Sequence, residues 1–356
     1  MRPTATLHEL GQSLWLDNIT RTMLDDGTLA RYVDELSVTG LTSNPTIFDK
    51  AISGTDAYDE QISELSARGL EGEELFFELA LTDLRRAAGL FDSVSKRTDH
   101  VDGWVSLEVS PLLADDAQAT IAQAADLHSR AECNVFIKIP GTEAGHEAIS
   151  EAILAGIPVN VTLLFSADHY LGAAEAYMRG VERRIEAGLD PAVGSVASLF
   201  VSRWDKAVID SAPDELRDRL GIAVARDAYR AYRELLDSER WQRLANEGAR
   251  PQRILWASTG TKDPDAADVL YIEALAAPFT VNTMPETTLL AFAEHGEVGE
   301  PLPADGGDAD EVLAAFAEAG TDAGALARRL QKEGAEAFVE SWRDLLATVG
   351  KAASRG

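Results

Sequence analysis

The sequence predicts an α/β protein in which parallel strands close into a (β/α)8 barrel, with additional helices in insertions and at the C-terminus. Short β-branched runs alternate with Ala-rich helical patterns along the chain, and no repeat longer than this unit is present. Strands that alternate with helices indicate βαβ units and a parallel sheet. Eight such units in series fit a barrel of the TIM type better than an open sheet. The expected strands cover residues 14–19, 38–43, 104–109, 134–140, 158–165, 195–202, 253–259 and 279–283.

The helices between the strands have recognisable ends. Thr142 can cap a helix after the fourth strand, and Gly156 can end it. Ser166 can cap the helix after the fifth strand, because a hydroxyl at this position accepts a hydrogen bond from the first helical turn. The two long connections, at 45–103 and 203–250, have helical patterns of their own. We therefore expect the insertions to be helical rather than irregular.

We expect the whole chain of 356 residues to form one domain. The barrel strands should lie within about 14–285, and a linker-like segment follows at 296–310. A helical extension is expected at about 308–350, where apolar residues recur at helical spacing. This extension is too short to form a core of its own, so it should pack on the barrel.

The charge of the chain excludes several kinds of partner. Sixty acidic residues against 32 basic ones leave a formal net charge of −28, which argues against nucleic acid and anionic membranes as partners.

No window approaches the roughly 20 apolar residues of a membrane-spanning helix, and the N-terminal residues lack the apolar stretch of a signal peptide. Cys133 is the only cysteine, so we expect a reducing, cytoplasmic setting. The histidines never pair at metal-ligand spacing, so we expect no metal site.

Two charged side chains fall on the inward-facing phase of neighbouring strands. Side chains alternate between the two faces of a strand, and in NVFIKIP the apolar residues on either side of Lys138 face the helices. Glu108 has the same phase in the preceding strand, and Asp17 has it at the end of the first strand. In the fifth strand, the alternation places Leu163 outward and Thr162 inward. The inward polar set is Asp17, Ser106, Glu108, Lys138, Asn160, Thr162, Ser198 and Ser258.

Serine, threonine and asparagine are ordinary fillers of a barrel interior, so any one of them alone carries little weight. Lys138 and Glu108 differ, because buried charges are costly unless they are paired or functional. A lysine on a strand often extends from a sheet edge into water, but a closed barrel has no edge strand. Lys138 is also the only lysine that falls inside an apolar strand. The pattern therefore favours a functional amine on the fourth strand.

An enclosed amine can act as a nucleophile. Desolvation disfavours the ammonium form, which makes Schiff-base formation with a ketone practical at neutral pH. Carbon–carbon cleavage through the resulting iminium needs a base for a substrate hydroxyl and an acid/base relay for the carbinolamine. Asp17 and Glu108 are the carboxylates placed for those two roles. This chemistry requires no cofactor.

The ordered motifs of the chain resemble the transaldolases, which are lysine-dependent class I aldolases of the pentose phosphate pathway. The resemblance runs from about residue 14 to residue 283 and covers all the expected strands. The motifs are WLDNI with Asp17, GLTSNPTIF with Asn44, SLEVSP with Glu108, FIKIPGT with Lys138, VNVTLLFS with Asn160 and Thr162, and SLFVSRWD with Ser198, Phe200 and Arg203. As an ordered set they are highly specific, although each alone would be weak.

The resemblance implies a ping-pong transfer of a dihydroxyacetone unit between sugar phosphates. Lys138 would attack the ketone of sedoheptulose 7-phosphate or fructose 6-phosphate, and Asp17 would remove the C4-hydroxyl proton. Glu108 and Thr162 would hold a water that moves protons around the Schiff base. Glyceraldehyde 3-phosphate would accept the unit from sedoheptulose 7-phosphate, giving erythrose 4-phosphate and fructose 6-phosphate. The resemblance, together with Ser258 at the end of the seventh strand and Lys262 after it, gives a substrate-binding set. Its members are Asn44, Asn160, Ser198, Phe200, Arg203, Ser258 and Lys262.

The chain departs from the family pattern after the seventh strand. Better-known transaldolases have a Ser-x-Arg there, whereas ASTGTKD has Ser258 followed by Gly260 at the arginine position. We expect Lys262 to supply the missing positive charge. A second departure, the EVSP sequence after Glu108, is expected to change only the local loop.

Two alternative functions are open at this point. A fructose 6-phosphate aldolase of the same superfamily would release free dihydroxyacetone, but such enzymes tend to have glutamine at the Glu108 position and tyrosine at the Phe200 position. A catalytically inactive barrel would be a binding protein, and fold alone does not exclude it. Such a barrel would have no reason to keep Lys138, Asp17 and Glu108 together. The chain could act as a homodimer or as a monomer.

Overall fold

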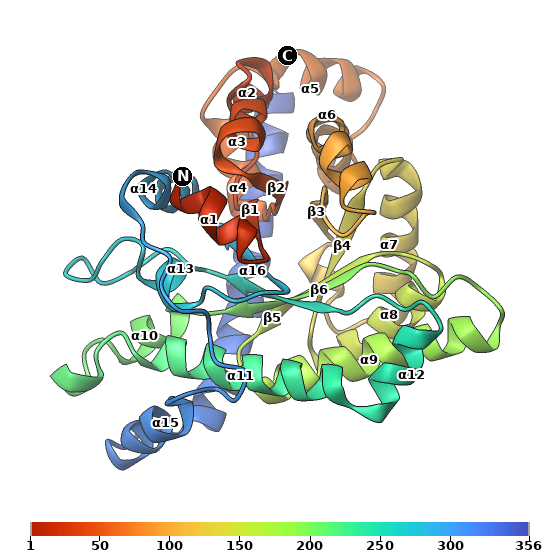
Figure 1. The fold of residues 1–356 in the computed structure, drawn as a ribbon. Coiled ribbons are helices and arrows are strands. Elements are labelled where there is room, and N and C mark those ends of the chain that lie inside the picture. Colours follow the sequence, from red (N-terminus) through yellow and green to blue (C-terminus); the bar gives the residue numbers. More distant parts are fainter. Residues whose placement is uncertain (1, 355–356) are drawn as a thin grey trace.

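The computed structural model describes residues 2–354 and shows a sheet of eight parallel strands wound into a barrel (Figure 1). This confirms the predicted (β/α)8 fold. The strands are β1 (Gln12–Leu16), β2 (Val38–Leu41), β3 (Val105–Glu108), β4 (Val135–Pro140), β5 (Val159–Leu164), β6 (Ser195–Phe200), β7 (Arg253–Ala257) and β8 (Thr280–Met284). Their order in the sheet is β2-β1-β8-β7-β6-β5-β4-β3.

Helices surround the barrel and fill the long connections. They are α1 (Pro3–Glu9), α2 (Arg21–Asp25), α3 (Thr28–Leu36), α4 (Pro45–Ser53), α5 (Asp59–Ala67), α6 (Gly72–Arg97), α7 (Ala117–Ala131), α8 (Glu143–Leu154), α9 (Ala167–Glu186), α10 (Ser202–Val208), α11 (Leu220–Asp237), α12 (Glu239–Asn246), α13 (Leu270–Ala274), α14 (Glu286–His295), α15 (Ala309–Glu318) and α16 (Ala323–Ala353), with the 3-10 turns η1 (Pro111–Leu113) and η2 (Asp214–Leu216). The predicted caps are present, since Thr142 accepts from the backbone N–H of Gly145 and Ser166 accepts from that of His169.

The barrel closes between β2 and β3, where the two ends of the sheet meet. Gly40 and Trp104 form a parallel bridge, and the Leu41 N–H donates to the Trp104 carbonyl at 2.9 Å. An ideally placed Cβ on Gly40 would lie 2.7 Å from the Trp104 carbonyl oxygen and 2.7 Å from Nε1 of Trp15. Only glycine allows this approach of the backbones, so Gly40 is required for closure.

The predicted alternation of side chains separates two hydrophobic cores. The outward residues of β4, including Ile137 and Ile139, pack with the surrounding helices. The inward residues, including Trp15 and Phe136, belong to a second cluster that continues onto residues of α10, α11, α15 and α16. The rings of Trp15 and Phe136 stack at a centroid distance of 5.9 Å. The inward positions near the carboxyl ends of the strands are polar instead, which leaves room for a site there.

Leu163 is an exception to the alternation, and its predicted outward orientation is wrong. Its φ angle is +63°, in the left-handed region that branched and bulky side chains rarely occupy. The pairing of β5 with β6 shifts register between Val161 and Leu164, so that Leu164 takes the outward place. Leu163 packs instead in the second cluster with Phe165 and Phe200.

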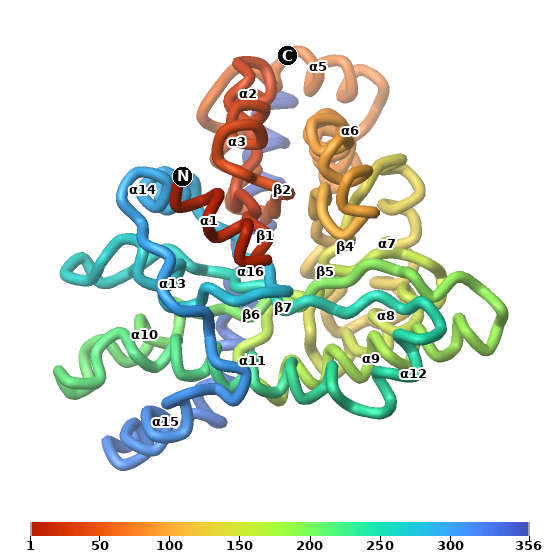
Figure 2. Tube along the Cα trace, viewed as in Figure 1, coloured from red at the N-terminus to blue at the C-terminus, as the bar shows by residue number. Residues whose placement is uncertain are grey.

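The C-terminal helix α16 lies against the barrel and the helices of the first insertion. It contacts α4, α5, α6, η1 and β5, and Figure 2 shows it passing beside segments from the start of the chain. Hydrogen bonds fix it there: Thr46 donates to Ser341 at 3.0 Å, and the Trp342 indole donates to Glu73 at 2.9 Å. Among residues 2–354, no helix combines the length and the apolar character needed to cross a membrane.

Candidate active site

A cavity of about 380 Å³ opens at the carboxyl ends of the barrel strands. This is the face where barrels of this kind hold their active sites, because the strand ends bring together side chains from distant parts of the chain. Most of the residues singled out from the sequence line it: Asp17, Asn44, Lys138, Thr162, Ser198, Phe200, Arg203, Ser258 and Lys262. The two others, Glu108 and Asn160, flank Lys138 in the sheet register.

Lys138 is buried at the base of this cavity, with 6% of its surface exposed. Its Nζ donates to the Ser43 carbonyl at 3.0 Å and lies 3.5 Å from Oε2 of Glu108. The ring of Phe338 lies over the amine, at 5.8 Å from Nζ to the ring centroid. The amine is therefore held in place by protein groups on one side and faces the cavity on the other.

Glu108 is a buried carboxylate with capacity for further hydrogen bonds. Burial raises its pKa, and the positive charge of Lys138 opposes that shift. Within residues 2–354, neither carboxylate oxygen of Glu108 nor the Thr162 hydroxyl has a hydrogen-bond partner. Buried polar atoms of this kind are normally satisfied by protein or by ordered water. The three atoms thus form a polar lining beside the amine that can bind a small hydrogen-bonding molecule.

Asp17 lies across the cavity, at the end of β1. Its backbone N–H donates to the Met284 carbonyl at 2.7 Å, which fixes its position beside β8. Burial raises the pKa of its carboxyl, opposed first by a hydrogen bond from Thr42 and then by the charges of Lys138 and Lys262. A carboxylate with a raised pKa is a stronger base than an exposed one, so Asp17 is suited to accept a proton.

Thr42 and Thr283 orient Asp17, and neither is among the site residues predicted from the sequence. The Thr42 hydroxyl donates to Oδ1 of Asp17 at 2.7 Å and lies 2.6 Å from the Thr283 hydroxyl. A hydroxyl carries one hydrogen, so Thr283 must be the donor to Thr42. The signal was present for Thr42, which lies two residues before Asn44 in the GLTSNPTIF motif.

Positive charge gathers on the β6 and β7 side of the cavity, at Arg203 and Lys262. The Arg203 guanidinium lies 4.9 Å from the centroid of the Phe200 ring, and burial lowers its pKa. Lys262 extends back over Gly260, since its Nζ would lie 3.8 Å from an ideal Cβ on that glycine. Within the described part of the chain, neither cation has a carboxylate partner. Both are therefore free to meet an anionic group of a ligand.

The remaining predicted residues form hydrogen bonds with neighbouring groups around the cavity. Ser198 donates to Oδ1 of Asn160 at 2.7 Å, and the Asn160 amide donates to Ser106 at 3.3 Å. Asn44 caps α4 by accepting from the Ile47 N–H at 3.0 Å. Ser258 pairs with Ser202 at 2.9 Å between hydroxyl oxygens, which ties the ends of β6 and β7 together.

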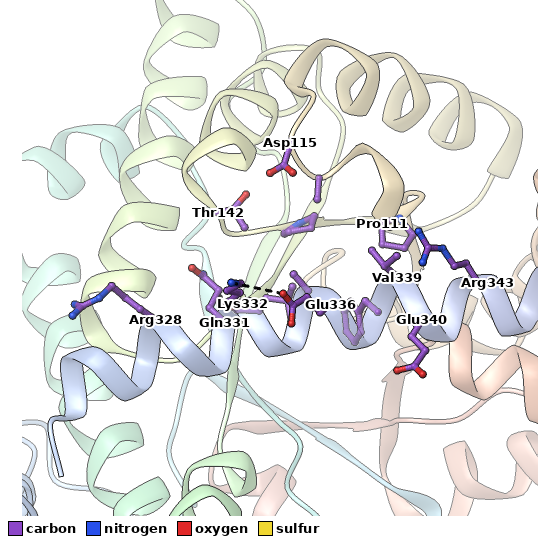
Figure 3. Close-up of a pocket in the computed structure, with 15 residues that line it drawn as sticks. Pro111, Asp115, Thr142, Arg328, Gln331, Lys332, Glu336, Val339, Glu340 and Arg343 are labelled. Carbon is purple, nitrogen blue, oxygen red and sulfur yellow. Dashed lines mark hydrogen bonds and ion pairs between the residues drawn. The ribbon is translucent and has the colours of Figure 1, made fainter. Parts of the chain in front are cut away.

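A second, larger groove of about 740 Å³ runs along α16 next to the cavity (Figure 3). Lys332 and Glu336 of α16 lie on the side of the helix near Thr142, and Arg328 lines the groove farther along the helix. Phe338 lines both the groove and the cavity, so its ring forms the partition between them. The sequence did not show that α16 contributes to the site. In residues 2–354, no cluster of three or more histidine, cysteine or acidic side chains could hold a metal ion.

Together the fold and the cavity define a (β/α)8-barrel enzyme in which a buried strand lysine faces carboxylates across a pocket with cationic groups at one end. The family model described as Transaldolase/Fructose-6-phosphate aldolase matches residues 14–349. The chain is 44% identical to a transaldolase of Frankia alni over 99% of this chain and 98% of that protein. It is 45% identical to a transaldolase of Kocuria rhizophila over 98% of this chain and 97% of that protein. The chain therefore belongs to the transaldolase/fructose-6-phosphate aldolase family.

Proposed function

We propose that the protein is a cytoplasmic transaldolase of the non-oxidative pentose phosphate pathway. It transfers a dihydroxyacetone unit from sedoheptulose 7-phosphate to glyceraldehyde 3-phosphate, giving erythrose 4-phosphate and fructose 6-phosphate. The observation that carries this proposal is the buried amine of Lys138, which lies 3.5 Å from Glu108 and faces a cavity that also contains Asp17.

The first half-reaction begins with the unprotonated amine of Lys138. Its nitrogen forms a bond to the keto carbon of the donor, and the carbonyl oxygen becomes the hydroxyl of a carbinolamine. Loss of water gives the iminium. Asp17 takes the proton of the C4 hydroxyl, the C3–C4 bond breaks, and its electron pair moves into the iminium to give an enamine. The aldose phosphate leaves, and the three-carbon unit stays on Lys138.

The second half-reaction reverses these steps with a different aldose phosphate. The enamine carbon forms a bond to the aldehyde carbon of the acceptor, and Asp17 returns its proton to the new hydroxyl. Water then adds to the iminium, and the ketose phosphate leaves Lys138. We propose that Glu108 and Thr162 hold the water that moves protons in these steps, because their oxygen atoms are buried and have unused hydrogen-bonding capacity.

We propose that Asn44 and Asn160 hydrogen-bond the hydroxyls of the dihydroxyacetone unit. Asn44 lines the cavity, and Asn160 is the sheet neighbour of Lys138. An amide nitrogen carries two hydrogens, and Ser106 accepts only one from Asn160, at 3.3 Å. The second hydrogen is available to a substrate hydroxyl.

We propose that Ser198 and Arg203 bind the phosphate of the substrate and that Lys262 supplies further positive charge there. Arg203 and Lys262 line the same end of the cavity and have no carboxylate partners among the described residues. Lys262 reaches the space beside Gly260, where the family pattern has an arginine. Local cations are needed here, because the net charge of −28 otherwise repels an anionic substrate.

Transfer to a sugar acceptor is favoured over release of free dihydroxyacetone by the residues at two positions. Glu108 supplies a carboxylate beside the amine. Phe200 presents an apolar ring to the cavity, which limits the access of water to the enamine. An assay with fructose 6-phosphate, with and without erythrose 4-phosphate, separates the two functions. Full turnover without an acceptor would show that the protein is a fructose 6-phosphate aldolase instead.

Borohydride trapping tests the proposed mechanism and the residue together. Incubation with fructose 6-phosphate and borohydride should reduce the Schiff base and leave a stable adduct on the peptide that contains Lys138, detected by mass spectrometry. Lys138→Met should abolish both the adduct and turnover. Lys96→Arg is the matched control, because Lys96 lies on the surface of α6 and pairs with Asp92. An adduct on another lysine, or turnover retained in Lys138→Met, would reject the proposal.

A further inference from the structure

Three residues of α16 form a line that faces the active site. Gln331, Gly334 and Phe338 are spaced three and four positions apart, so they lie on one face of the helix. The Gln331 amide donates to the carbonyls of Gly141 at 3.1 Å and Leu163 at 3.0 Å, which joins the ends of β4 and β5. Phe338 lines the cavity over Lys138. These two contacts therefore hold the intervening face of α16 close to the ends of the barrel strands.

Gly334 lies at the middle of this line, where the helix meets Arg203. An ideal Cβ on Gly334 would lie 3.0 Å from Nη1 of Arg203 and 2.9 Å from Cδ2 of Leu163. The guanidinium thus lies in the space that a side chain at position 334 would fill. Its other neighbour is the ring of Phe200, with Cζ 4.9 Å from the ring centroid.

Glycine in the middle of a long helix is unfavourable, because it gains more conformational freedom than alanine on unfolding. Gly334 is buried and lies inside the 31-residue helix α16. Its backbone is not in the left-handed region, so conformation does not require glycine there. What requires it is the close approach of Arg203 and Leu163.

We propose that Gly334 is a positioning residue for phosphate recognition, and that its missing side chain sets where the Arg203 guanidinium lies. The C-terminal helix is then part of the phosphate site although it supplies no ligand to the phosphate. This inference rests on the proposed role of Arg203. The leucine contact is adaptable, because Cδ2 is the end of a flexible side chain, whereas the guanidinium is held between the helix and the Phe200 ring.

The test uses Gly334→Ala with Gly350→Ala as its matched control. Gly350 lies in the same helix, and an ideal Cβ there would have no neighbour within 4 Å. The measurements are the inhibition constant of inorganic phosphate, the KM for fructose 6-phosphate, and borohydride trapping with dihydroxyacetone, which has no phosphate. In Gly334→Ala we expect the first two to rise about fivefold to tenfold, since a charge-assisted contact is displaced. Trapping with dihydroxyacetone should stay within about twofold, and Gly350→Ala should behave as the wild type.

Arg203→Ala distinguishes failure of this inference from failure of the proposed function. If Arg203→Ala leaves phosphate inhibition unchanged, the role of Arg203 is wrong. If Arg203→Ala weakens inhibition but Gly334→Ala does not, only the role of Gly334 is rejected. In the double variant, Gly334→Ala should add no further loss, because its effect passes through a guanidinium that is gone. Equal and additive losses would overturn the inference.

The double variant also covers the case in which Gly334→Ala does not fold. Removing the guanidinium opens the space for the new methyl group, so the double variant should fold and melt close to Arg203→Ala. If the double variant also fails to fold, the glycine is required by the packing of α16 on Leu163 and not by Arg203, and the inference is rejected.

Discussion

Replacing Lys262 by methionine should weaken the binding of phosphorylated substrates without affecting the chemistry at Lys138. Two unit charges 4 Å apart interact by about 1 kcal/mol in water and by about 4 kcal/mol near a protein surface. Lys262 is exposed, so the lower part of this range, about 1–2 kcal/mol, applies. This corresponds to a rise in KM of about 5- to 30-fold. The effect should shrink as salt is added, because salt screens exposed charges.

The assay compares KM for fructose 6-phosphate with the rate of borohydride trapping by dihydroxyacetone. Lys206→Met is the control, because Lys206 adds to the positive field around Lys262 but does not line the cavity. The KM of this variant should differ from that of the wild type by less than about threefold. Desolvation and the charges of Lys206 and Arg203 lower the pKa of Lys262. Lys262 should therefore lose its proton, and the KM of the wild type should rise, at a lower pH than it would if Lys262 had the pKa of an ordinary lysine. An unchanged KM in Lys262→Met would refute the assigned role.

Substitutions at three other buried positions, Glu108, Asp205 and Gly40, should change activity or stability. Glu108→Gln should lower kcat by about 100-fold or more, with little change in the inhibition constant of inorganic phosphate, measured by steady-state kinetics. Burial raises the pKa of Asp205 to about 6 from 3.8, so its contribution to stability is full below about pH 4 and is lost as the pH rises through about 6. The wild type should therefore lose up to about 3 kcal/mol of unfolding free energy between pH 4 and pH 7, and Asp205→Asn should not lose it, as measured by urea unfolding. If the difference in unfolding free energy between the two proteins is the same at both pH values, Asp205 does not titrate in this range. Gly40→Ala should cost about 1–3 kcal/mol in urea unfolding, because its Cβ collides with the Trp104 backbone and the Trp15 side chain at the barrel closure. Gly89→Ala, with open space around it, should be neutral or stabilising in the same measurement.

The features that could be predicted from the sequence are those that depend on local periodicity. Strand alternation has a period of two, so the inward phase of Lys138 and Glu108 follows from the residues on either side of each. The caps at Thr142 and Ser166 are equally local, since each hydroxyl binds a backbone N–H three residues along. Such patterns identify the face on which the cavity opens, because the carboxyl ends of parallel strands meet at one end of the barrel.

The features that could not be predicted depend on a backbone exception or on contacts between distant segments. Leu163 breaks the alternation through a φ of +63°, which no pattern of apolar residues reveals. Phe338 is far from Lys138 in the sequence, yet its ring covers the amine. The position of α16 over the site depends on tertiary packing, and its amphipathic pattern shows only that one face is buried.

Arg203 differs from the buried arginines elsewhere in the described part of the chain in having no carboxylate partner. Elsewhere in the protein, buried guanidiniums meet carboxylates: Arg21 pairs with Asp83 at 2.9 Å and Arg253 pairs with Asp102 at 3.0 Å. Leaving a cation unpaired in such surroundings is costly, because its lost hydration is not replaced. Arg203 is half-buried and has no such partner within residues 2–354, in a chain that has almost two acidic residues for each basic one. This difference from Arg21 and Arg253 supports the proposed binding of a substrate phosphate by Arg203.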